Sequence, residues 1–267
     1  MTKKMPVYYV SHGGGPWPWI ENARSAYADL AHCLAQIPTE LPQAPTAILM
    51  VSAHWESEAT FLLQSHPQPP MLYDYYNFPP HTYEVQYPAS GAPAFAQQVQ
   101  QLLQGAGISA ALDAERGFDH GAFVTAYMMY PEANIPMVQL SIDANYDPAQ
   151  HIALGAALQP LREQGVVIMG SGASYHNLRL MGAEGAVPSV QFDGWLENAL
   201  LNTSYSERIA QMLHWDQAPG ARIAHAREDH LVPLFVALGA STASDAVTRI
   251  LTTTSARGIK NASYRFG

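Results

Sequence analysis

The sequence contains little cysteine and little charge. Cys33 is the only cysteine among 267 residues, which excludes an internal disulfide framework and a cysteine-rich zinc site. Its helical surroundings predict a buried, apolar role for it. Lys and Arg number 13 against 22 Asp and Glu, so the basic surface that nucleic-acid binding requires is missing. Charged residues make up 13% and apolar residues 48%, which excludes a disordered or coiled-coil chain.

Long hydrophobic runs are also missing. No stretch approaches the ~18 apolar residues that a membrane span needs. The apolar run Val7–Val10 follows two lysines but ends before His12, so it does not form a secretory signal. We therefore expect a soluble, cytoplasmic protein without nucleic-acid or membrane partners, and the sequence leaves its oligomeric state open. No repeat or linker divides the chain, so we expect one domain over residues 1–267.

Short β-rich runs alternate with longer helical patterns along the chain. We predict strands over Val7–Val10, Ala47–Val51, Pro136–Ser141 and Val166–Met169. We predict helices over Arg24–Ile37, Ala94–Gln104, Pro148–Gln164, Trp195–Asn202 and Leu231–Leu238. This alternation predicts an α/β fold, a single three-layer domain with a largely parallel or mixed central sheet and helices on both faces.

The segment from His66 to Pro93 interrupts this alternation. It contains seven prolines and five tyrosines, too many prolines for a helix or a central strand. Long irregular loops in compact domains are usually functional lids or disordered linkers. The aromatic content argues against disorder. We therefore expect this segment to be an ordered functional loop.

Histidine is abundant, with eleven in the chain. His12, His54 and His176 each follow a predicted strand, and the carboxyl ends of parallel strands meet at one edge of a sheet, where ligands bind. His120 and His230, next to predicted helix starts, are further candidates. We expect ordinary hydrogen-bonded structural roles for the histidines at five other positions: His32, His66, His81, His151 and His214.

A cluster of neutral imidazoles suits zinc, copper, iron or nickel. Two or three such ligands leave coordination positions open, as catalysis requires, whereas a structural zinc site usually has four ligands including cysteine. The His-Glu-x-x-His motif of metalloproteases is absent from the sequence. The histidines therefore predict an open, catalytic metal site.

Two other motifs give weaker predictions. The run His12-Gly13-Gly14-Gly15 is similar to the oxyanion-hole run of lipases, but no Gly-x-Ser-x-Gly motif accompanies it. The same glycines are not followed by the Lys-Ser/Thr of a phosphate loop. The sequence therefore disfavours a serine hydrolase and a nucleotide-binding protein, and predicts a tight turn beside the site.

Several short motifs occur together in one order. They are Ser11-His12-Gly13-Gly14, Val51-Ser52-Ala53-His54-Trp55, Phe118-Asp119-His120-Gly121, Gly170-Ser171-Gly172 with His176-Asn177-Leu178-Arg179, His225 to His230 with Leu231-Val232-Pro233, and the terminal Ser263-Tyr264-Arg265-Phe266-Gly267. From Val7 to its end the chain resembles the DOPA-dioxygenase-type branch of the LigB-like class III extradiol ring-cleavage dioxygenases. The resemblance implies a single LigB-like catalytic domain and a non-haem Fe(II) enzyme. Such an enzyme opens a catechol ring next to its two hydroxyls with O₂, and Zn(II) can occupy the same site.

The resemblance also implies roles for individual histidines. His12, His54 and His230 would bind the metal. His176 would be the acid–base group, close enough to count as a further metal ligand, and His120 would contact the substrate or lie just behind it. The wider superfamily often completes its ligand set with Glu, and the matching segment here offers Glu228, Asp229 and His230; the closer branch favours His230.

The substrate and the reaction leave alternatives open. The segment Met71–Tyr87 would wall the pocket for a DOPA- or caffeate-like ring. Arg179, Arg227 and Arg265 are candidates for binding a substrate carboxylate, and the sequence does not rank them. A zinc-dependent hydrolase that uses the same cluster on water, and a catalytically silent zinc-binding relative, remain alternative functions.

Overall fold

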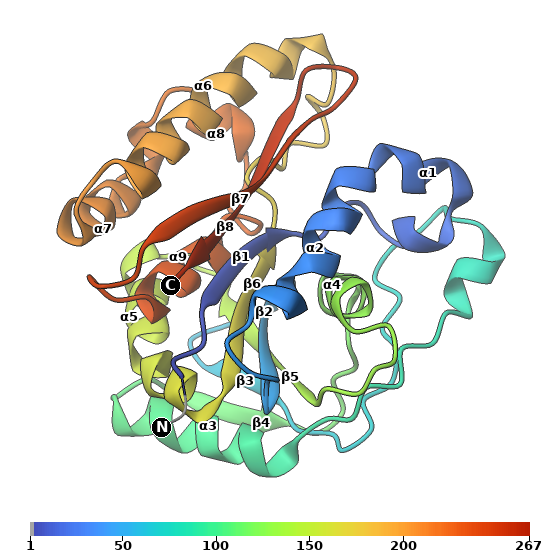
Figure 1. The fold of residues 1–267 in the computed structure, drawn as a ribbon, viewed down its shortest axis with the longest axis vertical. Helices are drawn as coiled ribbons and strands as arrows, with labels where there is room; N and C mark the ends of the chain where they lie inside the picture. The colour runs from blue at the N-terminus through green and yellow to red at the C-terminus, as the bar shows by residue number, and fades with distance from the viewer. Residues whose placement is uncertain (1–2) are drawn as a thin grey trace.

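The computed structural model describes residues 3–267. Within this range the strands form one eight-stranded sheet in the order β4-β3-β5-β2-β6-β1-β8-β7 (Figure 1). The four central strands are parallel: β5 (Met137–Asp143), β2 (Ala47–Ser57), β6 (Val166–Gly172) and β1 (Val7–Ser11). β3 (Phe61–Gln64) is antiparallel to β5 and parallel to β4 (Ala110–Asp113), and β8 (Lys260–Phe266) is antiparallel to β1 and to β7 (Val247–Thr254).

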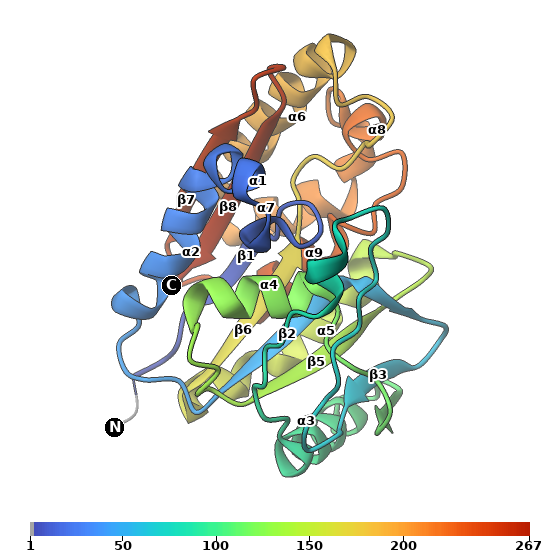
Figure 2. The same cartoon turned by 90° about the vertical axis from the view of Figure 1, so that its right-hand side faces the viewer.

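Helices cover both faces of the sheet, so the predicted three-layer α/β fold with a mixed sheet is confirmed (Figures 1 and 2). Helices α3 (Pro93–Gly105), α5 (Pro148–Leu158) and α9 (Val232–Ala240) pack on one face. Helices α2 (Ala28–Glu40) and α4 (His120–Met129) pack on the other. The remaining helices are α1 (Glu21–Ala26), α6 (Ala183–Leu201), α7 (Tyr205–Leu213) and α8 (Ala221–Ala224).

The central strands are buried on both faces, which explains why their sequences are apolar throughout. In β1, Val7 and Tyr9 belong to the core under α5 and α9, whereas Tyr8 and Val10 belong to the core under α2 and α4. Successive side chains of a strand point to opposite faces, so one strand supplies both cores.

Several predicted element bounds were wrong. The helix predicted over Arg24–Ile37 is divided at Tyr27 into α1 and α2, and the helix predicted to reach Gln164 ends at Leu158 and continues as a 3₁₀ turn. Helix α6 begins twelve residues before the predicted Trp195, because Pro188 and two glycines obscure its helical pattern. β3, β4, β7, β8, α7 and α8 were not predicted.

The segment from His66 to Pro93 is irregular except for a 3₁₀ turn at Pro80–Tyr83. A bridge between Met71 and Phe118 attaches it to the segment that leads into α4. Cys33 lies in the buried face of α2, and burial raises the pKa of its thiol to about 11, as expected for an apolar role. None of the helices between residues 3 and 267 has the length and apolar character that a membrane span requires.

Candidate functional site

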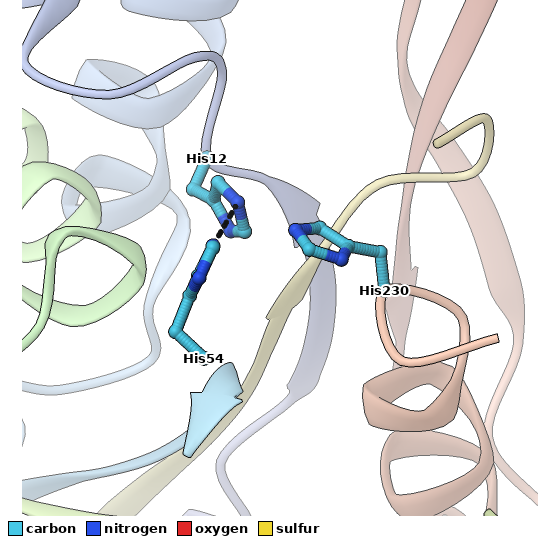
Figure 3. Close-up of side chains that lie close together, drawn as sticks. All are labelled: His12, His54 and His230. Atoms are coloured by element: carbon cyan, nitrogen blue, oxygen red, sulfur yellow. Dashed lines mark hydrogen bonds between the residues drawn. The ribbon is translucent and has the colours of Figure 1, made fainter. Parts of the chain in front are cut away.

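Three histidines from distant parts of the chain meet at one edge of the sheet (Figure 3). His12 directly follows β1, and its backbone N–H donates to the Gly172 carbonyl, which prolongs the pairing of β1 with β6. His54 was predicted to follow its strand but lies inside the longer β2, where the register with β5 shifts between Val51 and Glu56. His230 lies two residues before α9.

The three rings face one another closely. The Nε2 atoms of His12 and His54 are 3.2 Å apart, and each of the three residues offers a ring nitrogen within 4.8 Å of the others. His12 and His230 are buried and His54 is half-buried. The expected convergence of His12 with His54 is therefore present, and His230 joins them.

His120 and His176 extend the cluster on opposite sides. His120 is the first residue of α4, and its ring centroid lies 4.1 Å from that of His54. The His176 ring stacks on the His230 ring, with centroids 3.3 Å apart and an interplanar angle of 15°. All five candidate histidines thus lie together.

The structural role expected for His151 is present in the fold. Its Nδ1 donates to the Asp147 carbonyl and its Nε2 accepts from the Asp143 backbone N–H, so both ring nitrogens are used within the α5 region. The other four histidines expected to be structural lie outside the cluster: His32, His66, His81 and His214.

The hydrogen bonds of His12 fix which of its nitrogens carries the proton. Ser171 Oγ donates to the Gly121 carbonyl at 2.7 Å, so it accepts from Nδ1 of His12 at 3.0 Å. Nε2 of His12 therefore presents a lone pair toward Nε2 of His54. Nδ1 of His54 lies 3.3 Å from the Asp74 carboxylate, which favours the proton on that nitrogen. Two lone pairs then face each other at 3.2 Å, an arrangement that a shared cation stabilises.

The spacing and environment of these nitrogens fit a metal ion. Two nitrogens bound to one zinc ion at ~2.0–2.1 Å lie roughly 3.0–3.4 Å apart in common geometries. Nδ1 of His230 lies 3.2 Å from Asp229 Oδ1, which leaves Nε2 as the His230 nitrogen for a metal. The donor set of neutral imidazoles suits zinc or iron. The residues present therefore fit a divalent metal.

Burial favours the neutral form of four of these histidines, His12, His54, His176 and His230. Desolvation, reinforced by the neighbouring histidines, lowers the pKa of His12 and His230 well below 6.5. Desolvation also lowers the pKa of His54 to about 4, and it lowers the pKa of His176 although Asp229 opposes the shift. Metal binding needs unprotonated imidazole, so these rings are in the form that binds a cation.

Two carboxylates, Asp74 and Asp229, flank the cluster. Neither was predicted from the sequence to position a histidine. Asp74 Oδ1 accepts hydrogen bonds from the backbone N–H of His120 at 3.0 Å and from its Nδ1 at 2.8 Å. Burial raises the pKa of Asp74, but the hydrogen bonds and charges of the two histidines outweigh it and lower the pKa below 3.8. Asp229, considered only as an alternative ligand, lies 3.2 Å from Nδ1 of His230 and 3.8 Å from Nδ1 of His176.

A third carboxylate, Asp119, anchors the start of α4. It is fully buried and caps the helix by accepting from the Ala122 N–H. It also accepts from Ser52 Oγ at 2.7 Å, from Arg116 at 3.0 Å and from the Gln139 side chain. This network joins β2, β5 and α4 behind His54 and His120. The sequence signal was an Asp directly before a helix start, the usual N-cap.

The glycines after His12 serve backbone geometry rather than phosphate binding. Gly13 has a φ of +75°, and a Cβ there would lie 2.5 Å from the indole nitrogen of Trp17, which donates to the His12 carbonyl. Gly15 has a φ of +54°, and a Cβ there would lie 2.7 Å from the Phe78 ring. Only glycine fits a left-handed backbone this close to aromatic rings.

The three candidate arginines lie in different surroundings. Arg227 is two residues from Asp229, pairs with Glu56 of β2 and has a side chain that is 58% exposed. Arg265 pairs with Glu40 at the end of α2. Arg179 is exposed on the loop after His176. Arg227, joined to the same strand as His54 and to the segment of His230, is the arginine at the rim of the cluster.

Comparisons with known proteins identify relatives of this chain. Residues 5–267 match the model of a family described as the catalytic LigB subunit of aromatic ring-opening dioxygenase. The chain is 37% identical over 247 residues to a 4,5-DOPA dioxygenase extradiol of Beta vulgaris, covering 88% of this chain and 86% of that protein. It is 34% identical over 260 residues to a 4,5-DOPA dioxygenase extradiol of Escherichia coli strain K12, covering 92% and 89%.

A solved structure shares the whole fold. The crystal structure of an uncharacterized protein from Escherichia coli K12 superposes with a TM-score of 0.78 at 30% identity, covering 99% of this chain and 100% of that one. The family match spans nearly the entire chain, and the two relatives are 37% and 34% identical over most of it. This chain therefore belongs to the LigB family of aromatic ring-opening dioxygenases.

Proposed function

We propose that this protein is an Fe(II)-dependent extradiol dioxygenase that opens the ring of a catechol with O₂. The observation that carries the proposal is the convergence of His12, His54 and His230, with the Nε2 atoms of His12 and His54 3.2 Å apart. The 4,5-DOPA dioxygenase extradiol names of the relatives support a DOPA-like or caffeate-like catechol as substrate.

His12, His54 and His230 would hold the metal. Of the three alternatives in the segment of His230, Glu228 pairs with Arg222 at 2.8 Å, and Asp229 Oδ1 accepts from the His230 backbone N–H. The His230 ring alone of these three groups meets His12 and His54. When bound there, Fe(II) would supply a chelation site for both catechol oxygens, lower the pKa of their hydroxyls and bring O₂ beside the ring.

His176 would move the protons of the substrate. Its neutral imidazole stacks on the His230 ring and its side chain remains 26% exposed, so it lies between the cluster and solvent. It would accept a catechol hydroxyl proton and return it later in the reaction. His120, across the cluster and packed edge-on to Tyr75, would contact the substrate ring.

The Tyr/Pro-rich segment would wall the ring-binding site. Tyr75 packs edge-on against Phe78, and Phe78 reaches the glycine turn after His12. These apolar rings would exclude water from one side of a flat aromatic substrate. Zn(II) would fill the same ligand set without redox chemistry.

Oxygen uptake by protein loaded anaerobically with Fe(II) tests the proposed function. We expect one O₂ consumed per catechol and a yellow product opened next to the two hydroxyls, with both oxygen atoms incorporated. A monophenol, which cannot chelate, should not react, and Zn(II)-loaded protein serves as the matched control. Ester hydrolysis without oxygen uptake would instead support the zinc hydrolase. Binding of Zn(II) without any turnover would support the catalytically silent relative.

A further inference from the structure

The carboxylate of Asp74 touches two histidines of the cluster at once. Its Oδ1 accepts two hydrogen bonds from His120, at 3.0 Å from the backbone and 2.8 Å from Nδ1. Its Oδ2 lies 3.3 Å from Nδ1 of His54. The Asp74 side chain is 17% exposed, and the two imidazoles are 22% and 7% exposed. One largely buried charge therefore faces the outer nitrogens of two adjacent rings.

Asp74 reaches this position from the irregular segment Met71–Tyr87. Hydrogen bonds inside the segment hold it: the Tyr73 hydroxyl donates to the Val85 carbonyl at 2.7 Å and the Tyr75 hydroxyl to the Thr82 carbonyl at 2.6 Å. The Leu72 N–H donates to the Phe118 carbonyl at 2.8 Å, two residues before His120. The backbone on both sides of the carboxylate is thus fixed relative to α4.

These contacts fit a positioning role better than direct metal binding. His54, Asp74 and His120 could by composition form a metal site of their own. However, Oδ1 accepts two hydrogen bonds from His120, and a metal at that place would have to displace the Nδ1 proton. A carboxylate behind a metal-binding imidazole commonly fixes its tautomer and orientation and increases its basicity.

We propose that Asp74 is a positioning residue, whose carboxylate orients His54 toward the metal and fixes the segment Met71–Tyr87 to the cluster through His120. This inference rests on the metal centre of the proposed function. In this role, the Asp74 side chain determines both the metal affinity of the cluster and the position of the aromatic segment Met71–Tyr87 beside it. Loosening the segment at Asp74 would move the carboxylate charge away from Nδ1 of His54, whereas loosening it elsewhere would not.

Metal affinity measured without turnover tests this role. Asp74→Asn preserves the size of the side chain but removes its charge, and we expect ~10–100-fold weaker binding of Zn(II) and Co(II) in chelator competition. One equivalent should still bind at saturation, with a changed visible spectrum of the Co(II) form. Asp74→Glu, which moves the charge by one methylene, should show a smaller loss and provides a second variant if Asp74→Asn does not fold.

Tyr73→Phe is the matched control, because it removes a hydrogen bond from the same segment without touching either histidine. Its metal affinity should equal that of the wild type. Unchanged affinity in Asp74→Asn, or an equal loss in Tyr73→Phe, would overturn the positioning role. Two bound equivalents in the wild type, one of them lost in Asp74→Asn, would also overturn it in favour of a second metal site.

Failure of this inference is distinguishable from failure of the proposed function. His12→Ala removes a proposed ligand that does not contact Asp74. If His12→Ala abolishes metal binding while Asp74→Asn binds normally, only the positioning role is wrong. If His12→Ala retains a full equivalent, the proposed metal centre itself is wrong.

Discussion

The two sides of the histidine cluster are held to different degrees. On the side of His54 and His120, the Asp74 carboxylate lies 3.3 and 2.8 Å from the respective ring nitrogens. On the side of His230 and His176, the Asp229 carboxylate lies 3.2 and 3.8 Å from the respective ring nitrogens. His176 is therefore the ring farthest from its carboxylate, which leaves its imidazole the freest of the four to exchange protons.

The surroundings of the two sides differ in the same sense. Ser171 behind His12 and the Asp119 network behind His54 tie these rings to β6, β2, β5 and α4. The backbone of His176 is held by the Ala224 carbonyl, but its ring is 26% exposed. A metal ligand needs fixed geometry, whereas a proton-transfer group needs contact with both substrate and solvent.

Removing a ring from the fixed side should have the largest effect. We expect His54→Ala and His12→Ala to lose the bound metal. Their loss of metal affinity should exceed the ~10–100-fold that is usual when a residue hydrogen-bonded to a metal ligand is removed. Metal analysis after dialysis measures this, and thermal melting of the metal-free proteins controls for folding. A full equivalent of metal in both variants would contradict the assignment of His12 and His54 as ligands.

Removing His176 from the looser side should separate turnover from binding. We expect His176→Ala to lower kcat by ~10²–10⁴, the usual contribution of a general acid–base group, while a full equivalent of metal remains bound. Steady-state oxygen uptake and metal analysis on the same sample provide the two readouts. Loss of the metal together with activity would show that His176 acts first as a ligand, and the contrast between the two sides would disappear.

The smallest effect is expected at the rim. Arg227→Ala should raise KM for a carboxylated catechol ~2–5-fold without changing KM for catechol itself, because exposed ion pairs are worth only ~0.2–1 kcal/mol. Arg179→Ala is the matched control, since Arg179 is also exposed but lies on the loop after His176. If Arg227→Ala changes KM equally for the carboxylated catechol and for catechol itself, Arg227 does not recognise the carboxylate. The same conclusion follows if Arg179→Ala changes KM as much as Arg227→Ala does.

Among the candidate histidines, His12 and His176 could be found from the sequence because the strands that precede them are apolar. Strands such as β1 and β6 are buried on both faces and end abruptly in glycine and polar residues, so their carboxyl ends are visible in the sequence. The prediction for His54 was less accurate because β2 continues past Val51 through a register shift. The polar residues Ser52 and Glu56 on either side of His54 hide this continuation of the strand in the sequence.

The edge of the sheet was harder to predict. β7 is Thr-rich and partly exposed, and β3 and β4 are four residues long, so neither periodicity nor length distinguishes them from loops. Asp74 was missed for a different reason. It lies in a Pro- and Tyr-rich segment without regular structure, where no periodicity indicates which way a side chain points.

The sequence by itself determined the layered α/β architecture, the family resemblance and the set of histidines, because these depend on local patterns and on residue order. Only the tertiary structure decided that Asp74 lies behind His54, that Ser171 fixes the proton of His12 and that Asp229 stands farther from His176 than from His230. These contacts join residues as much as 159 positions apart. Their distances depend on how β1, β2, β6 and the segment Met71–Tyr87 pack together, which no local pattern specifies.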